Sequence, residues 1–476
     1  MAEYTPSEMA SALMEYGYGS LWEQFVDGTI ANLVTTIDTI GPATIANRQS
    51  VKTVFAPRCS FVSMSAFLNY FALENLYLPG LKSMGMGAFA RCVYLKSVSF
   101  PTCERIESYA FQACRTLSRL SIPQCIGIGS HAFEGCNNLL SAHFTECTSI
   151  GISAFAGCVR LSDLSFPKCK YLGNMAFSDC RISAKTHFPA CLSIGQGVFY
   201  GCAFLCEADF PICEVVRGDA FQYCFNLSFI SFPVCTELGG NTATYRGVFY
   251  KCSKITSYYF PNCKTIYPYA FCSCDNVLSL SFPVCETIGQ SAFANCSTLT
   301  SIFFPKCLSV MANAFNYCVS LEYADFPLCL EIGVSAFFRC VHLKSVSLPS
   351  CLAISKYAFY SCVSLPYISL PMCIRIYSEA FENCVQLSTV SLDACTRIES
   401  SAFYNCKKLK NLYLLGKSFC SLMAPASIVF ASCPILTRGS GSIFVPSSLY
   451  PTYFGDAKWE QVAWNLVAVD DQETEE

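Results

Sequence analysis

Apolar and polar residues follow one recurring order along this chain. In residues 97–100, serine and apolar residues alternate with period two, which predicts a short strand with one buried face. Pro101 ends that strand, because proline has no backbone N–H to donate to a neighbouring strand. A turn that contains Ile106 follows, and then a short helical or irregular segment with Ala110 and Phe111. The same order returns throughout the chain.

One phenylalanine marks each copy of this pattern, and the copies are 22 residues apart. These residues are Phe67, Phe89, Phe111, Phe133, Phe155, Phe177, Phe199, Phe221, Phe249, Phe271, Phe293, Phe315, Phe337, Phe359, Phe381 and Phe403. The single exception is the step from Phe221 to Phe249, which is 28 residues long. Degenerate copies with Ile45 and Phe430 in this position flank the series and bring the total to about 18. A period of 22 residues lies within the roughly 20–29 residues of a leucine-rich repeat.

The repeat predicts the fold class and the domain boundaries. One copy cannot bury its apolar face alone, so the copies are expected to stack into a solenoid with a continuous core. The predicted fold is an α/β repeat solenoid of the leucine-rich-repeat type, with about 18 turns and a parallel sheet on one face. Thr5, Pro6 and Glu8 have the order of a helix capping box. We therefore expect a helical N-terminal cap over 1–39, the solenoid over 40–435, a C-terminal cap over 436–469 and an acidic tail over 470–476.

The chain contains 34 cysteines, and their positions follow the repeat. Sixteen lie three residues after the repeat phenylalanine position, fifteen lie two residues after the proline position, and Cys206, Cys272 and Cys420 remain. Zinc sites instead pair their cysteines at spacings such as C-x₂₋₄-C. We expect buried, reduced thiols that serve as small core residues. A ladder of disulfides between turns and a ladder that binds a soft metal are the alternatives.

Composition and charge exclude several classes of protein. The chain is 53% hydrophobic with a mean hydropathy of +0.39, but it has no run of 18 apolar residues, so no membrane insertion is predicted. The net charge is −3 and no basic stripe occurs, so nucleic acid is not an expected partner. The first residues lack the basic start and apolar core of a signal peptide.

No catalytic residue, metal site or cofactor is predicted. The four histidines are His131, His143, His187 and His342. His143 and His187 share one strand position two copies apart, about 10 Å, which is too far for a shared metal or a catalytic pair. The motifs G-x-S-x-G and H-E-x-x-H and a glycine-rich phosphate loop do not occur. A cysteine nucleophile would need a partly exposed site, whereas the repeated cysteines are expected to be buried.

Candidate binding residues occupy the two outward positions of each predicted strand, eight and ten residues after the repeat phenylalanine. Most copies carry serine there, but two regions differ. One is aromatic, with Phe229, Tyr259, Phe303, Tyr323 and Tyr367; the other is charged, with Asp163, Lys185, His187, Glu207 and Asp209. Exposed aromatic residues are enriched in interfaces, so the aromatic set is the first candidate for ligand binding and the charged set the second. The alternative is that the aromatic rings only pack on one another along the ladder.

The longer step between Phe221 and Phe249 contains six additional residues. Insertions in repeat proteins form loops, often on a binding face. Asn241, Tyr245 and Arg246 of this insertion are therefore candidate binding residues. A surface loop without function is the alternative.

The phrase FP-x-C-x-x-IG-x-x-AF-x-x-C-x-x-L resembles the BspA-like class of leucine-rich repeat over residues 40–470. It is matched by Phe282, Pro283, Cys285, Ile288, Gly289, Ala292, Phe293, Cys296 and Leu299. Residues 439–469 are similar to the C-terminal cap of such arrays in gut Firmicutes proteins and in phage or prophage tail-associated proteins. The resemblance implies a non-enzymatic protein that binds a protein or glycan on a cell surface.

The resemblance and the absence of a signal peptide together give an expected setting. We expect a phage or prophage tail-associated protein that contacts a host surface, and a virion-associated or cytoplasmic location. A bacterial cell-surface adhesin, placed there by a non-Sec route, is the first alternative. A structural spacer that binds no ligand is the second, and the oligomeric state is left open.

Overall fold

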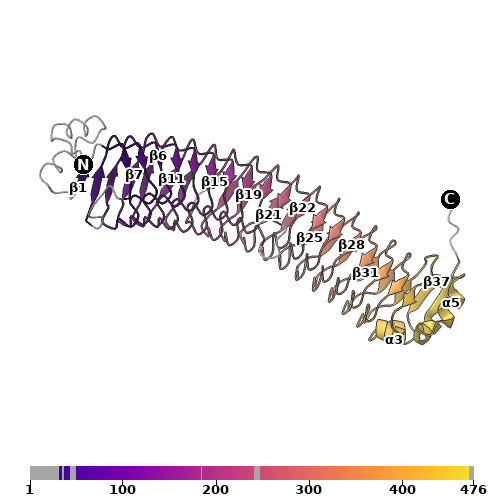
Figure 1. Ribbon diagram of the computed structural model, residues 1–476. Coiled ribbons are helices and arrows are strands. Elements are labelled where there is room, and N and C mark those ends of the chain that lie inside the picture. The colour runs from indigo at the N-terminus through magenta and orange to yellow at the C-terminus, as the bar shows by residue number, and fades with distance from the viewer. Residues whose placement is uncertain (1–31, 35–36, 43–49, 184, 241–246, 471–476) are drawn as a thin grey trace. The chain divides into compact units, whose positions relative to one another are not determined.

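The computed structural model describes residues 32–34, 37–42, 50–183, 185–240 and 247–470. They form two compact units, Met1–Phe232 (unit 1) and Pro233–Glu476 (unit 2). Within each unit, the chain winds through similar turns that lie side by side (Figure 1). The stacked solenoid predicted from the period is confirmed.

In unit 1, each turn has one strand of three residues and one of two residues. The three-residue strands are β1 (Asn32–Val34), β3 (Thr53–Phe55), β5 (Asn75–Tyr77), β7 (Ser97–Ser99), β9 (Arg119–Ser121), β11 (Ser141–His143), β13 (Asp163–Ser165), β15 (Lys185–His187), β17 (Glu207–Asp209) and β19 (Phe229–Ser231). The two-residue strands are β2 (Thr39–Ile40), β4 (Phe61–Val62), β6 (Ser83–Met84), β8 (Arg105–Ile106), β10 (Gly127–Ile128), β12 (Ser149–Ile150), β14 (Tyr171–Leu172), β16 (Ser193–Ile194) and β18 (Val215–Val216). Neighbouring strands of one kind run parallel with a register of one turn, as in the pairs Ser97↔Arg119 and Val98↔Leu120.

Unit 2 continues the same pattern. Its three-residue strands are β21 (Ser257–Tyr259), β23 (Ser279–Ser281), β25 (Ser301–Phe303), β27 (Tyr323–Asp325), β29 (Ser345–Ser347), β31 (Tyr367–Ser369), β33 (Thr389–Ser391) and β35 (Asn411–Tyr413). Its two-residue strands are β20 (Glu237–Leu238), β22 (Thr265–Ile266), β24 (Thr287–Ile288), β26 (Ser309–Val310), β28 (Glu331–Ile332), β30 (Ala353–Ile354), β32 (Arg375–Ile376), β34 (Arg397–Ile398) and β36 (Ser421–Leu422).

The last part of unit 2 closes the stack with different elements. They are α3 (Ala426–Val429), α4 (Pro434–Thr437), β37 (Ser442–Pro446), α5 (Tyr450–Gly455), the 3-10 helix η2 (Glu460–Asn465) and β38 (Leu466–Val469). Strand β37 pairs in parallel with both β35 and β38, so it extends the sheet of three-residue strands. Trp459 is fully buried beneath this cap, where its indole Nε1 donates to the carbonyl of Cys420 at 3.1 Å.

The segment around each repeat phenylalanine was expected to be helical or irregular, and the structure shows consecutive turns. The residues two before and two after the phenylalanine adopt left-handed backbone angles, for example φ of 62° at Tyr109 and 58° at Ala113. Side chains disfavour this conformation by about 1 kcal/mol or more per residue. Hydrogen bonds to the next turn offset that cost: Phe111 N–H donates to the carbonyl of Ala132 at 2.7 Å, and Ala113 N–H to that of Glu134 at 2.7 Å.

The repeat phenylalanines form a continuous column in the core of each unit. All sixteen are fully buried. Neighbouring rings stack nearly parallel, as between Phe89 and Phe111 in unit 1, with centroids 5.2 Å apart, and between Phe359 and Phe381 in unit 2, also 5.2 Å apart. Phenylalanines that directly follow three-residue strands contact this column at various angles, from 24° between Phe100 and Phe111 to 71° between Phe282 and Phe293.

Buried cysteines fill the space beside this column, as expected. The structure records all 34 cysteines as free thiols, of which Cys206 is exposed and the others are buried. In the first cysteine column, thiols donate to the carbonyl of a repeat phenylalanine in the preceding turn, as Cys114 does to Phe89 at 3.2 Å. In the second column, each thiol donates to the carbonyl two residues later, as Cys285 does to Thr287 at 3.4 Å. Valine or alanine could fill this volume but could not donate a hydrogen bond.

Parts of the predicted domain plan lie outside the described residues. Residues 1–31, where the helical cap was expected, the degenerate copy at Ile45 and the tail at 471–476 are among them. The predicted boundaries of the caps stay predictions.

Truncating a repeat phenylalanine should destabilise the stack locally. Phe293 stacks on Phe271 and Phe315 at centroid distances of 5.0 and 5.3 Å. We expect Phe293→Ala to cost about 3–5 kcal/mol, because a large buried ring leaves a cavity. Since turns contact mainly their neighbours, hydrogen exchange should accelerate within a few turns of residue 293. The exposed Ser301→Ala change is the control, and a uniform loss of protection over the chain would contradict the stacked core.

Native thiol labelling should modify one residue. Burial raises the pKa of Cys285 and Cys351 to about 12, so these thiols are protonated at neutral pH as well as shielded. We expect a maleimide to label Cys206 alone in the folded protein, and nearly all 34 cysteines after unfolding. Cys206→Ser should abolish the native label. A smaller count after unfolding without reductant would indicate disulfides between turns.

Candidate functional site

The outer face of the three-residue strands presents the first and third residue of each strand. In β21, Tyr258 points inward and is 1% exposed, while its neighbour Tyr259 points outward and is 65% exposed. This alternation follows from the pleat, which sends successive side chains to opposite faces. The positions predicted from the period therefore lie on the surface of each unit.

Four of the predicted aromatic residues lie on this face of unit 2. Their exposed fractions are high: Tyr259 65%, Phe303 56%, Tyr323 52% and Tyr367 50%. We call these four residues the aromatic strip. They stand on β21, β25, β27 and β31, and the register Ser301↔Tyr323 makes Phe303 and Tyr323 diagonal neighbours on adjacent strands.

The rings of the aromatic strip have no aromatic partners among the described residues: no stacked or edge-on ring pair includes any of the four. Elsewhere on the same face such a pair does form, because Tyr413 and Phe444 stack with centroids 4.4 Å apart. Packing of the strip's rings on one another was the alternative to binding, and the described contacts do not include it. Their use in binding stays a prediction.

Phe229 belongs to another part of the surface. It lies in unit 1 on β19, 50% exposed, and it pairs in register with Glu207 of β17. Phe229 therefore lies beside the predicted charged residues of unit 1.

The predicted charged residues Asp163, Lys185, His187, Glu207 and Asp209, which we call the charged patch, lie on consecutive strands β13, β15 and β17. They are largely paired with one another or with a neighbour. His187 Nδ1 lies 2.9 Å from Asp209 Oδ2, and Lys185 Nζ lies 3.7 Å from Glu207 Oε2. Asp163 Oδ2 lies 2.7 Å from Nε2 of His143. A ligand at the charged patch would have to compete with these internal pairs, each of which is exposed to solvent and weak.

Sequence reasoning missed several side chains around the charged patch. His143 on β11 contacts Asp163 at 2.7 Å, and the sequence analysis had not identified this partner. Phe204 and Phe225 are exposed in the connections that precede β17 and β19, and the guanidinium of Arg181 lies 4.9 Å from the Phe204 ring. The sequence could have drawn attention to Phe204, which lies five residues after its repeat phenylalanine. Other copies carry a polar residue in that position: Thr116, Asn138 and Arg160.

Unit 2 also carries a column of exposed aliphatic residues that the sequence analysis did not single out. In four successive turns, the residue directly before the two-residue strand is an exposed aliphatic one: Leu308, Leu330, Leu352 and Ile374. The backbone N–H of each of the last three donates to the carbonyl of the one before it, at 2.8–2.9 Å. They form a narrow apolar edge beside β26 to β32.

The insertion residues Asn241, Tyr245 and Arg246 lie outside the described residues. Their predicted role in binding stays a prediction.

All four histidines have a partner: besides His143 and His187, His131 lies 3.1 Å from Glu134 and His342 lies 2.6 Å from the carbonyl of Val319. In the described ranges, no three His, Cys, Asp or Glu side chains gather where they could hold a metal ion. No helix within those ranges is long and apolar enough to cross a membrane.

Comparison with known proteins supports the repeat type. A family model described as BspA type leucine rich repeat region matches six overlapping stretches, residues 29–140, 60–183, 127–243, 192–322, 242–353 and 308–437. No match is found among curated proteins.

The solved structures that resemble the chain include bacterial leucine-rich-repeat proteins. One from Bacteroides ovatus is 20% identical, covers 87% of this chain and 94% of its own, and gives a TM-score of 0.51. A leucine rich cell surface protein from Faecalibacterium prausnitzii is 18% identical, with coverage of 83% and 89% and a TM-score of 0.31. One from Eubacterium ventriosum is 19% identical, with coverage of 74% and 90% and a TM-score of 0.34. At this identity, the first of these shows the fold alone.

Proposed function

The chain belongs to the BspA-type leucine-rich-repeat family, and we propose that it is a non-catalytic recognition protein whose aromatic strip binds a protein or glycan on a cell surface. One observation carries the proposal: four rings without aromatic partners stand half-exposed or more on an outer face that is otherwise rich in serine. Repeat proteins use extended faces of this kind for binding.

Exposure of these rings to water costs hydrophobic free energy. Each aromatic side chain buries roughly 150–250 Å² when it is covered, and it has few rotatable bonds whose freedom must be lost. Contact with a partner therefore recovers hydrophobic free energy at a small entropic cost. The outward serines between the rings, such as Ser281 and Ser345, are small enough to let a partner approach the sheet closely.

Rigidity favours the same role. The strip lies on strands whose inward residues are packed in the core, such as Ile302 and Ala324, both 4% exposed. Phe303 and Tyr323 thus lie on two strands, β25 and β27, that are hydrogen-bonded to each other, and not on a loop. Because the rings are presented by a rigid backbone, less conformational entropy is lost when a partner binds.

Within this function, we propose a phage or prophage tail-associated protein as the setting, with a bacterial adhesin as the second candidate. The support is the likeness of residues 439–469 to the C-terminal caps described above. The neighbouring genes test this part: genes for tail and baseplate proteins would support the first setting, and genes for cell-wall or secretion proteins the second.

Removing rings of the aromatic strip should weaken binding without unfolding the protein. We expect Tyr259→Ala and Tyr323→Ala each to reduce binding to the target cells by about 1–2 kcal/mol, which is about 5- to 30-fold in Kd. The measurement is binding of fluorescently labelled protein to a panel of gut bacterial and epithelial cells, first for the unmodified chain and then for the variants.

Ser281→Ala, on the same face and in register with Tyr259, is the matched control. Thermal unfolding of every variant shows whether the fold is kept. Full binding by a folded Tyr259→Ala/Tyr323→Ala double variant would contradict the role of the strip. The same assay on Lys185→Ala and Asp209→Ala would then test the charged patch, and a protein that binds no cell in the panel would favour the structural spacer.

A further inference from the structure

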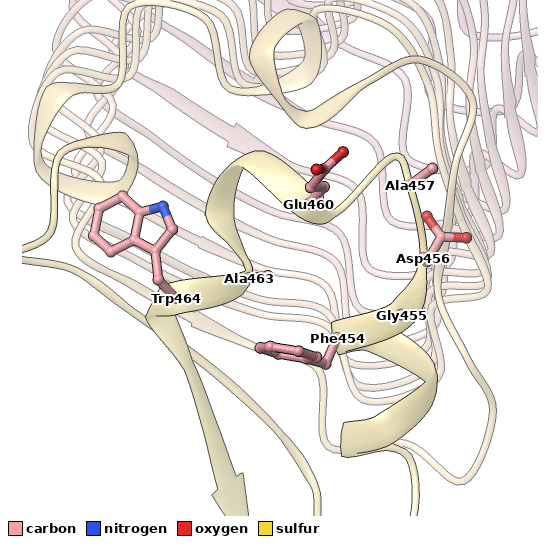
Figure 2. A pocket seen from close by; sticks show the side chains of 7 residues that line it. All are labelled: Phe454, Gly455, Asp456, Ala457, Glu460, Ala463 and Trp464. Atoms are coloured by element: carbon pink, nitrogen blue, oxygen red, sulfur yellow. The ribbon is translucent and has the colours of Figure 1, made fainter.

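The C-terminal cap contains an open pocket that lies apart from the strand face. It has a volume of about 560 Å³ and is lined by Phe454, Gly455, Asp456, Ala457, Glu460, Ala463 and Trp464. These residues come from α5, from η2 and from the short connection between them, so the pocket lies within unit 2. In the view of Figure 2, the indole of Trp464 and the carboxylate of Asp456 lie on opposite sides, with Phe454 and Glu460 between them.

Two exposed aromatic rings form part of the wall. Phe454 is 58% exposed and Trp464 is 53% exposed, although a third large aromatic residue of this cap, Trp459, is fully buried. Exposed tryptophan and phenylalanine in a concave site are typical of ligand pockets.

The Trp464 ring is held in one position. Its Nε1 donates to the backbone carbonyl of Gln461 at 3.0 Å, so its single polar hydrogen is satisfied inside the protein. Gly439 lies against the ring: a Cβ atom at residue 439 would come within 2.8 Å of Trp464 Cζ3. What Trp464 offers to a ligand is thus the π system of a fixed ring.

The pocket also carries negative charge without a matching cation. Asp456 and Glu460 are its charged lining residues, and neither forms an ion pair with a lysine, arginine or histidine in the described part of the chain. The nearby Lys458 turns its Nζ away and donates to the carbonyl of Leu422 at 2.8 Å. Among the described contacts, the side chain of Asp456 accepts one hydrogen bond, at its Oδ1 from the backbone N–H of Lys458 at 2.8 Å, which leaves Oδ2 for a ligand.

We propose that this pocket binds an organic ammonium group on an aliphatic stem, of the kind that a lysine side chain carries. The negative face of an aromatic ring attracts a cation within about 6 Å, and a carboxylate adds a direct charge contact. The aliphatic stem would lie against Phe454 and Ala463. A volume of about 560 Å³ is ample for one such side chain.

Two competing chemistries fit less well. A phosphocholine group would bring its negatively charged phosphate into a pocket that two carboxylates line, and like charges repel. A neutral sugar could stack on Trp464, but it would leave both carboxylates without a counter-charge. The paired presence of rings and carboxylates therefore favours a cation without an accompanying anion.

The test uses the full chain and the probe Nα-acetyl-lysine methylamide, followed through the indole N–H signal of Trp464 in NMR. The chain has three tryptophans, and a Trp464→Phe spectrum assigns the signal. We expect a saturable shift of the Trp464 signal, with a Kd near the millimolar range expected for a single side chain, on the order of 1 mM. Raising the salt concentration should weaken the binding, because exposed charges are screened.

Matched variants separate the contributions. Glu460→Gln and Asp456→Asn keep the shape of the side chain and remove its charge, and each should weaken binding by about three- to tenfold. Trp464→Ala should weaken it by about tenfold, detected by calorimetry because the reporter is lost. Gln461→Ala is the control, because Gln461 lies exposed on the same helix and contributes its backbone carbonyl, not its side chain, to Trp464.

Three results would overturn the proposal. The first is an unmoved Trp464 signal up to about 50 mM probe, far above a millimolar Kd. The second is equal binding of the uncharged norleucine analogue, which would show that the ammonium group contributes nothing to the affinity. The third is stronger binding of phosphocholine or of a neutral monosaccharide than of the lysine probe. Each of these outcomes leaves the aromatic strip untouched, so the two sites can fail independently.

Discussion

The structure depends on the constraint that every turn must place its backbone groups opposite the same groups of the next turn. Backbone N–H and C=O groups are obligatory hydrogen-bonding partners in a protein interior. In this chain they pair along the three-residue strands, the two-residue strands and the turns around the repeat phenylalanine, where Phe89 N–H, for example, donates to the carbonyl of Ala110 at 2.8 Å. Additional residues fit between the paired segments without breaking the ladders: in the 28-residue step, Glu237 and Leu238 of β20 still pair in register with Thr265 and Ile266 of β22. Elsewhere between Phe67 and Phe403 the step is 22 residues, which keeps equivalent backbone groups opposite one another.

The same constraint accounts for the cysteines. The carbonyl of Phe89 accepts the N–H of Cys92 at 3.3 Å and the thiol of Cys114, one turn later, at 3.2 Å. The interior position beside the phenylalanine column thus needs a residue that is small, apolar and able to donate weakly. Cysteine meets these conditions in turn after turn. The outward positions of the strands are under no such constraint, because their side chains contribute little to the stack.

Sequence reasoning reached the features that repeat. The phenylalanine column, the buried cysteines and the outward positions of Tyr259 and Tyr323 follow from the 22-residue period alone, and the structure confirms their placement. The left-handed angles at Tyr109 and Ala113 did not follow, because neither residue type favours them and only the ladder between turns imposes them. The contact between His143 and Asp163 was also missed, since it joins side chains 20 residues apart whose geometry the period does not specify.

The proposed binding sites lie where side chains depart from the common repeat: at the rings of the aromatic strip, at the charged patch as the second candidate, and in the cap around Trp464. All of these depend on the register of the turns beneath them. The most direct test removes one complete turn, residues 272–293, and compares it with removal of half a turn, residues 283–293. The first deletion joins Phe271 to Ala294 and keeps the register, so the account predicts a folded chain with cooperative thermal unfolding and thiols that stay protected. The second should expose thiols and lose cooperative unfolding, and equal stability of the two deletions would contradict the account.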